Sequence, residues 1–306
     1  MIHYFFKRLG FNLIALWVIV TLTFFLMKAI PGDPFAQEKA LPKEILDALY
    51  KHYKLDQPLY KQYLSYLKSI VTWNLGPSFK YKTRTVNEII KSGFPISAIL
   101  GLEAMLLAIF FGITFGSLAA IKKNRWQDYS AMVGASLGIS VPHFILAAFL
   151  QYFLAIKLDL FPVARWGTWQ QTILPAISLA ALPTAFIARL TRSNLIEVLE
   201  KDYIKTAYAK GLNKYKILIK HGLRNAILPV ITYLGTLSVN ILTGSFVIEK
   251  IFGIPGLGQW FINSVMNRDY TVIMGLTVFY SILLLSATFM IDLLYGIIDP
   301  RINIRE

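Results

Sequence analysis

The chain has 306 residues, 56% of them hydrophobic, and its mean hydropathy is +0.54. Soluble globular domains rarely exceed about half apolar residues, so this composition indicates a membrane protein. The absence of cysteine excludes disulfides, thiolate metal sites and a cysteine nucleophile. The formal net charge of +14 does not indicate nucleic-acid binding, because the basic residues gather at the ends of apolar runs, where they signal membrane topology.

The first apolar run covers residues 9–30 and is long enough, at about 20 residues, to cross a bilayer. Lys7 and Arg8 precede it, as they would in a secretory signal peptide. The run is longer than the apolar part of such a peptide, and no small-residue cleavage site follows it. We therefore expect a retained membrane span, followed by a turn at residues 31–34 (Pro-Gly-Asp-Pro).

Residues 31–95 form a long polar segment that contains two weak helical patterns. Ile45, Leu49 and Tyr53 lie four residues apart, and a second apolar stripe covers residues 60–67. A loop of this length within a membrane protein is usually functional or forms a small domain. The tyrosines and lysines are equally compatible with a helix that lies at the membrane interface.

Five further apolar runs predict an all-α polytopic protein with six transmembrane helices; they lie at about residues 97–121, 130–156, 172–191, 226–247 and 272–298. Basic residues of the short loops gather on one side of the predicted membrane: Lys7, Arg8, Lys122, Lys123, Arg125, those from Arg189 to Arg224, Arg301 and Arg305. The opposite short loops hold only Lys157, Arg165, Lys250 and Arg268. This asymmetry predicts that both termini are cytoplasmic.

Small residues and prolines recur inside the spans. The pairs Gly112/Gly116 and Gly134/Gly138 have the spacing that lets two helices approach closely. Proline inside a span removes a backbone hydrogen bond, which is tolerated where neighbours or a cavity replace it; such prolines are Pro142, Pro175 and Pro183. Glu103 lies in the second run, where it either snorkels to the interface or belongs to a polar pathway.

A polar stretch from Asp202 to Pro229 separates two long apolar runs and therefore lies outside the bilayer. Its first part predicts one amphipathic helix, with an apolar stripe of Leu195, Leu199, Tyr203 and Ala207 beside Val198 and Ile204. Glu197 and Lys201 are spaced for an ion pair, Gly211 is expected to end the helix, Asn213 can cap the next one, and Pro229 stands near the following span. Such a helix either rests on lipid headgroups or docks in a groove of a partner protein.

Residues for catalysis are scarce. The sequence has no phosphate-binding P-loop, and its four histidines are too scattered to suggest a metal site. Residues 134–138 (Gly-Ala-Ser-Leu-Gly) match the Gly-x-Ser-x-Gly pattern of serine hydrolases, with His143 nearby. That motif works as a strand-to-helix turn, whereas here it lies in an apolar helical run, so we interpret it as helix packing. A passive channel would leave the amphipathic helix unexplained.

Residues 202–212 resemble the cytoplasmic loop of permease subunits in binding-protein-dependent ABC importers, in the class that carries dipeptides, oligopeptides or nickel. Lys205 stands where the general signature of that loop has glutamate, and Asn74 where the family usually has aspartate. The stretches that resemble the family extend over nearly the whole chain: Pro31–Pro34, Leu55–Leu59, Gln62–Leu64, Leu75–Ser78, Val141–Phe144, Leu160–Val163, Arg189–Ser193, Glu249–Phe252, Pro255–Gly258, Arg268–Tyr270 and Asp299–Arg301.

The resemblance implies the architecture of a type I ABC importer permease, in a bacterial cytoplasmic membrane. It implies a cytoplasmic N-terminus and first span (residues 1–30), an external segment (31–95) and a five-helix core (96–306) with the coupling loop 192–225. The expected partners are a second, related permease, two ATPase subunits, an extracytoplasmic substrate-binding protein and membrane lipid, with no nucleic acid. The chain itself is expected to be non-catalytic and to need no cofactor or metal, because ATP and Mg²⁺ bind to the ATPase subunits.

The resemblance also assigns two sets of contact residues. The ATPase is expected to meet the coupling helix at Leu199, Asp202, Tyr203, Thr206, Ala207, Lys210 and Gly211. The binding protein is expected to meet the outer surface at Pro255, Gly256, Arg268 and Asp269. The substrate that passes between them is expected to be a peptide, or else a nickel complex.

Overall fold

The computed structural model describes residues 2–31, 43–81, 83–242 and 246–298. This part of the chain is built from helices, with one isolated β-bridge between Pro77 and Thr85, which confirms the predicted all-α fold. The contacts divide the chain into two compact units, one made of residues 1–96 with 256–306 and the other of residues 97–255. The predicted turn at residues 31–34 and the ending Asp299–Arg301 lie, except for Pro31, outside the described residues.

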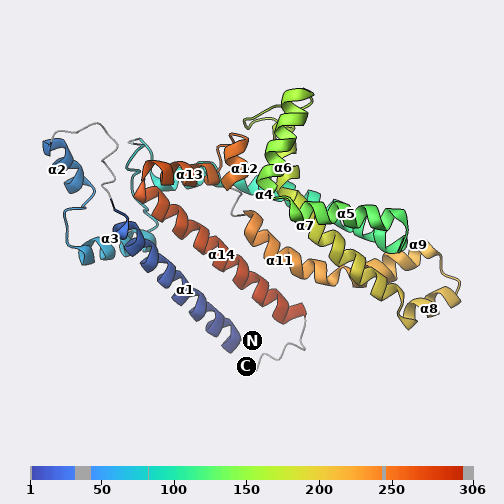
Figure 1. The fold of residues 1–306 in the computed structure, drawn as a ribbon. Helices are drawn as coiled ribbons and strands as arrows, with labels where there is room; N and C mark the ends of the chain where they lie inside the picture. The colour runs from blue at the N-terminus through green and yellow to red at the C-terminus, as the bar shows by residue number, and fades with distance from the viewer. Residues whose placement is uncertain (1, 32–42, 82, 243–245, 299–306) are drawn as a thin grey trace. The chain divides into compact units, whose positions relative to one another are not determined.

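The first unit is built around two long antiparallel helices, α1 (Ile2–Ala29) and α14 (Tyr270–Ile298), which lie side by side (Figure 1). Asn12 of α1 donates a hydrogen bond of 3.3 Å from Nδ2 to the carbonyl oxygen of Leu285 in α14. The contacts thus pair the last span with the first. The predicted division had instead grouped the last span with the other spans of residues 96–306.

The polar segment of the first unit folds into two helices, α2 (Lys43–His52) and α3 (Leu59–Val71), as their apolar stripes predict. α13 (Leu257–Asn267) and the beginning of α4 (Val86–Ile121) complete the unit. Their shared core consists of Leu75, Val86, Ile89, Ile90, Leu257, Val272, Leu276 and Phe279.

α4 begins well before the predicted start of the second span at residue 97 because Thr85 and Glu88 form a capping box. The Glu88 amide donates to Thr85 Oγ1 at 3.2 Å, and the Thr85 amide donates to Glu88 Oε2 at 2.8 Å. The helix then continues through Pro95.

The second unit contains the rest of α4 and the helices α5 (Trp126–Ser140), α6 (His143–Leu150), η1 (Gln151–Lys157), α7 (Trp169–Leu199), α11 (Leu228–Leu242) and α12 (Phe246–Ile251). α7 runs unbroken through both of its buried prolines. Two predicted glycine contacts are confirmed, because a Cβ atom on Gly112 would lie 2.6 Å from Ile187 Cβ and one on Gly116 would lie 2.5 Å from the carbonyl oxygen of Ala188. Of the second pair, Gly138 packs closely on α7, whereas Gly134 faces open space.

The third predicted span is not one straight helix. It breaks between Ser140 and His143, and α5 and the helix that follows are bent by 104°. Pro142 explains the break, since it cannot donate a backbone hydrogen bond and it disfavours a helical conformation at Val141, whose ψ is 118°. The predicted run over residues 130–156 is therefore a bent pair of helices, with its break at the proline that was expected to remove a backbone hydrogen bond.

Four helices of the described residues are long and apolar enough to cross a membrane: Phe5–Ala29, Val86–Ile121, Trp169–Leu199 and Tyr270–Ile291. The bent pair makes a fifth when it is counted as one span. α11 has 15 residues, and the predicted run to residue 247 continues into residues outside the described part. Six spans therefore stay a prediction.

Candidate functional site

The polar stretch predicted to leave the membrane folds as a short helix, α8 (Asp202–Ala209), set at an angle after α7. The predicted apolar stripe does not lie on one helix, because α7 ends at Leu199 and Lys201 is extended, with a ψ of 149°. The predicted ion pair between Glu197 and Lys201 is present at 3.1 Å and bridges this break.

Glu200, at the break itself, is held from a neighbouring loop. Lys123 donates to Glu200 Oε1 at 2.8 Å, and this hydrogen bond holds the pKa of the Glu200 carboxyl below its usual value. Both side chains are exposed, so the pair adds little to stability.

One face of α8 packs into the chain's own core. Ile204 is 1% exposed and Ala207 is 7% exposed, and both contact Ile217, with Leu199 and Leu212 around them. The apolar stripe is therefore an internal packing surface. This corrects the expectation that Ala207 packs against a partner protein.

The opposite face of α8 is exposed and polar. We call it the α8 outer face and define it as Asp202, Tyr203, Lys205, Thr206, Ala209 and Lys210. Four of the predicted ATPase contacts lie on it: Asp202, Tyr203, Thr206 and Lys210. Of the other three, Leu199 belongs to the supporting core, Ala207 is buried and Gly211 follows the helix.

Gly211 ends α8 as predicted, with a φ of +73°. The amide of Leu212 donates to the carbonyl oxygen of Ala207 at 3.3 Å, and the amide of Gly211 donates to that of Tyr208 at 2.9 Å. These two bonds, together with the contact of Leu212 in the core, make a Schellman motif. Asn213 then caps the next helix, accepting from the Tyr215 amide at 3.0 Å, which confirms its predicted role.

The layer beneath α8 consists of α9 (Lys214–Lys216), η2 (Ile217–Leu223) and α10 (Arg224–Ala226). From this layer Asn225 donates to the hydroxyl of Tyr203 at 2.9 Å and to the carbonyl oxygen of His221 at 3.1 Å. The Tyr203 ring is therefore held in place although it is 41% exposed. No local pattern predicts this contact, because the two residues belong to different helices.

An ion pair between a half-buried arginine and a buried aspartate anchors α7 close to the loop that leads into α8. Arg192 binds Asp128 of α5 through two hydrogen bonds, from Nε at 2.5 Å and from Nη2 at 2.7 Å. Asp128 is 2% exposed, and it also accepts from the Asn124 amide at 3.0 Å. This bidentate pair positions the helix that leads into α8.

The predicted binding-protein contacts differ in exposure. Pro255 is exposed, Gly256 is buried as the residue before α13, and Arg268 is half-buried in the left-handed conformation after it. Asp269 is fully buried in the first unit. Only Pro255 and Arg268 therefore offer side chains to a partner.

Asp269 acts within the fold. Its carboxylate accepts from the Val272 amide at 3.3 Å, which caps α14, and from Ser78 Oγ and the Phe79 amide, the latter at 3.1 Å. It thus ties the loop after α3 to the start of the last span.

Nothing in the described residues supports the hydrolase alternative. Ser136 lies inside α5, where its hydroxyl donates to the carbonyl oxygen of Met132 at 2.8 Å and accepts from Arg189 at 2.7 Å. It is not on the sharp turn that the motif requires. No group of three or more potential metal ligands lies within the described ranges.

Comparison with known proteins identifies the family. Residues 112–304 match the family described as "Binding-protein-dependent transport system inner membrane component", and residues 1–101 match its N-terminal companion. The chain belongs to this family. It is therefore a multi-pass membrane component of a transport system that also contains an ATPase and a substrate-binding protein.

Individual relatives match over the full length. The chain is 51% identical over 306 residues to the "Dipeptide transport system permease protein DppB" of Bacillus subtilis, covering 100% of this chain and 99% of that one. It is 45% identical over 305 residues to the "Oligopeptide transport system permease protein OppB" of Haemophilus influenzae, covering 99% and 100%.

Solved structures support the fold. An amino acid ABC transporter matches 76% of this chain and 98% of its own with a TM-score of 0.55, at 15% identity. The MetNI methionine ABC transporter in an inward-facing conformation matches 69% and 96% with a TM-score of 0.53, at 17% identity. These likenesses confirm the permease architecture that the sequence predicts.

Proposed function

We propose that this chain is the membrane-spanning subunit of an ATP-driven importer that takes up di- or oligopeptides delivered by a substrate-binding protein. The observation that carries the proposal is the full-length similarity to permeases named for dipeptide and oligopeptide transport. These names favour peptides over nickel complexes as the substrate. The chain provides a pathway and a mechanical connection, and it needs no catalytic residue of its own.

The α8 outer face is the proposed seat of the ATPase subunit. This face is exposed, and its helix is fixed by a Schellman motif and an internal core. A hydrogen bond from Asn225 holds Tyr203 in place. A short rigid helix of this kind can bind in a groove of a partner protein and can transmit the movement of that partner to α7. The Asp128–Arg192 pair then passes this movement to α5.

The proposed assembly contains a second permease, related but not identical to this chain, and two ATPase subunits that bind ATP and Mg²⁺. The ATPase pair closes on ATP, moves α8 of this chain, and opens the pathway alternately to the two sides of the membrane. The contact of Lys123 with Glu200 puts the basic loop 122–125 on the same side as α8, and its basic residues support a cytoplasmic location for both termini.

The substrate is tested by uptake in cells whose own peptide permeases have been deleted and that receive this chain with its partner subunits. We expect accumulation of a radiolabelled dipeptide and pentapeptide, dependent on ATP. Cells that lack only this chain serve as the control. Accumulation of ⁶³Ni²⁺ without peptide uptake would contradict the peptide assignment and support the nickel alternative.

A further inference from the structure

The first unit contains a cavity of about 500 Å³ whose charged lining side chains are lysines, with no carboxylate among the described residues that line it. Lys28, Lys54 and Lys68 contribute from α1, the loop after α2, and α3. His52 also lines the cavity. A cavity with this lining attracts anions.

The position of the cavity relative to the membrane follows from the two spans that form it. Its lining includes Phe24, Met27 and Lys28 near the end of α1, and Tyr270 and Met274 near the start of α14. Because the two helices are antiparallel, these ends lie at the same level, where the hydrocarbon core gives way to water. In the proposed orientation this level is the outer leaflet.

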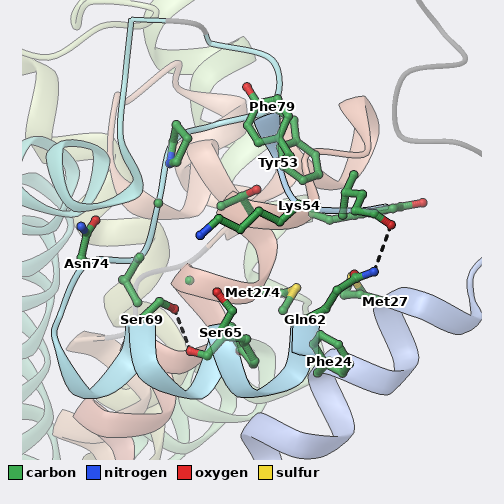
Figure 2. A pocket seen from close by; sticks show the side chains of 18 of the residues that line it. Phe24, Met27, Tyr53, Lys54, Gln62, Ser65, Ser69, Asn74, Phe79 and Met274 are labelled. Carbon is green, nitrogen blue, oxygen red and sulfur yellow. Dashed lines mark hydrogen bonds between the residues drawn. The ribbon is translucent and has the colours of Figure 1, made fainter. Parts of the chain in front are cut away.

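The walls combine apolar and polar groups. Figure 2 shows Lys54 reaching into the space between Tyr53 and Phe79 on one side and Met274 and Ser65 on the other. Aromatic and methionine side chains suit the glycerol and upper acyl region of a lipid, whereas lysines suit its phosphate. One ligand that satisfies both surfaces is an amphiphile with an anionic head.

Lys54 occupies a position that the backbone would favour for glycine. It follows α2 with a φ of +56°, and the amide of Leu55 donates to the carbonyl oxygen of Tyr50 at 2.8 Å, as in a Schellman motif. A residue with a Cβ atom is disfavoured in this conformation. The turn nevertheless places a lysine there, and its side chain enters the cavity (Figure 2).

Two tyrosines of the lining contribute their rings to the cavity wall but not their hydroxyl groups. The hydroxyl groups of Tyr66 and Tyr270 are buried and have no hydrogen-bond partner among the described residues. Burial raises the pKa of Tyr66, so its hydroxyl keeps its proton and remains a donor. Neither hydroxyl is accessible from the cavity, so an anion there would be held by the lysines and not by these tyrosines.

We propose that this cavity binds the headgroup of an anionic phospholipid, with Lys28, Lys54 and Lys68 around the phosphate. Basic pockets between membrane helices are a known way of recognising anionic lipids. The lipid would brace α3 and the loop 74–79 against the two spans. This inference rests on the chain being a membrane protein and is independent of the substrate that it carries.

The test uses the full-length chain purified with its partner subunits in detergent. Phosphatidylglycerol is titrated in, and bound lipid is counted by native mass spectrometry. We expect Lys54→Gly to weaken binding of one phosphatidylglycerol by about fivefold and Lys28→Gln by a similar factor. Lys54→Gly also relieves the left-handed backbone, so its thermal stability should not fall and misfolding cannot explain the loss.

Lys51→Ala is the matched control, because Lys51 is an exposed lysine in the last turn of α2, just before Lys54, and does not line the cavity. It should bind phosphatidylglycerol like the wild type. The proposal is overturned if Lys54→Gly retains wild-type binding, or if phosphatidylcholine binds as tightly as phosphatidylglycerol. It is also overturned if glycerol phosphate competes at concentrations equal to those of the lipid, since the ligand would then be a soluble phosphate.

Discussion

Gly211 ends α8 in a conformation that other residues rarely adopt. A Cβ atom added there would meet no other heavy atom within 4 Å, although its φ is +73°. The requirement for glycine is therefore conformational rather than steric. Gly134 offers a contrast, because it also faces open space but lies within α5.

Replacing each of these two glycines by alanine gives a matched pair of variants. We expect Gly211→Ala to destabilise the end of α8 by about 1–2 kcal/mol, the strain of a left-handed alanine. Gly134→Ala should stabilise the chain by roughly 0.5–1 kcal/mol, because alanine loses less entropy in a helix. Hydrogen exchange of the α8 and α5 amides measures both effects. Equal protection of α8 in Gly211→Ala and in the wild type would show that glycine is not required there.

Polar residues could be interpreted from the sequence where their partners are local. Gly211, Asn213 and the Glu197–Lys201 pair all act within a few residues of their own position, and the structure confirms them. Asp128 and Asp269 could not be interpreted in this way. Their partners Arg192 and Ser78 are distant in the sequence, so Asp128 carried no signal, and Asp269 was assigned from the resemblance to an outer contact and not to this internal role.

At the scale of the element, α8 has two faces with different tasks. Its inner face is fixed by Ile204 and Ala207 against Ile217, and its outer face is exposed. Periodicity predicted an amphipathic helix but not which face a partner would meet. The core against which the apolar face packs comes from η2, a segment whose return to α8 depends on the turn at residues 211–213.

Neighbouring positions on α8 separate folding from docking. Ala207→Asp places an unpaired charge in the internal core, and we expect it to lower the free energy of unfolding by roughly 3 kcal/mol or more. Thr206→Asp puts the same side chain on the α8 outer face, where the cost to stability should be within about 0.5 kcal/mol. It should nevertheless weaken retention of the ATPase subunits and abolish peptide uptake.

Thermal unfolding in detergent and co-purification of the ATPase measure these two effects separately. Lys214→Ala, an exposed position beyond the cap, is the control and should leave both unchanged. Full ATPase retention and full uptake by Thr206→Asp would contradict docking at the α8 outer face. The lipid-resting interpretation of the helix would then be preferred.

Breaks between elements were harder to predict than the elements themselves. The four-residue spacing of Leu199, Tyr203 and Ala207 continues across the extended Lys201, so the pattern alone concealed the turn. Pro142 predicts a break in the helix, but the proline alone does not predict that the two parts are bent by 104°. Hydrophobic runs thus locate the spans, and tertiary contacts decide whether they are straight.

At the scale of the whole molecule, the sequence predicts membrane spans and their direction from different signals. The length of the apolar runs locates the spans, and the four long helices and the bent pair correspond to predicted runs. The direction in which the spans cross the membrane is predicted from the lysines and arginines of the short loops. Contacts within the chain carry no information about this direction. The orientation is therefore a separate proposal that needs its own experiment.

The absence of cysteine makes that experiment direct, because each introduced thiol is the only one in the chain. Asp56 is exposed between α2 and α3, and Lys214 is exposed after α8. In intact cells a membrane-impermeant maleimide should label Asp56→Cys and not Lys214→Cys. After the cells are opened, both variants should be labelled, which controls for the reactivity of each thiol. Labelling of Lys214→Cys alone in intact cells would reverse the proposed topology, and it would place α8 where no cytoplasmic ATPase could reach it.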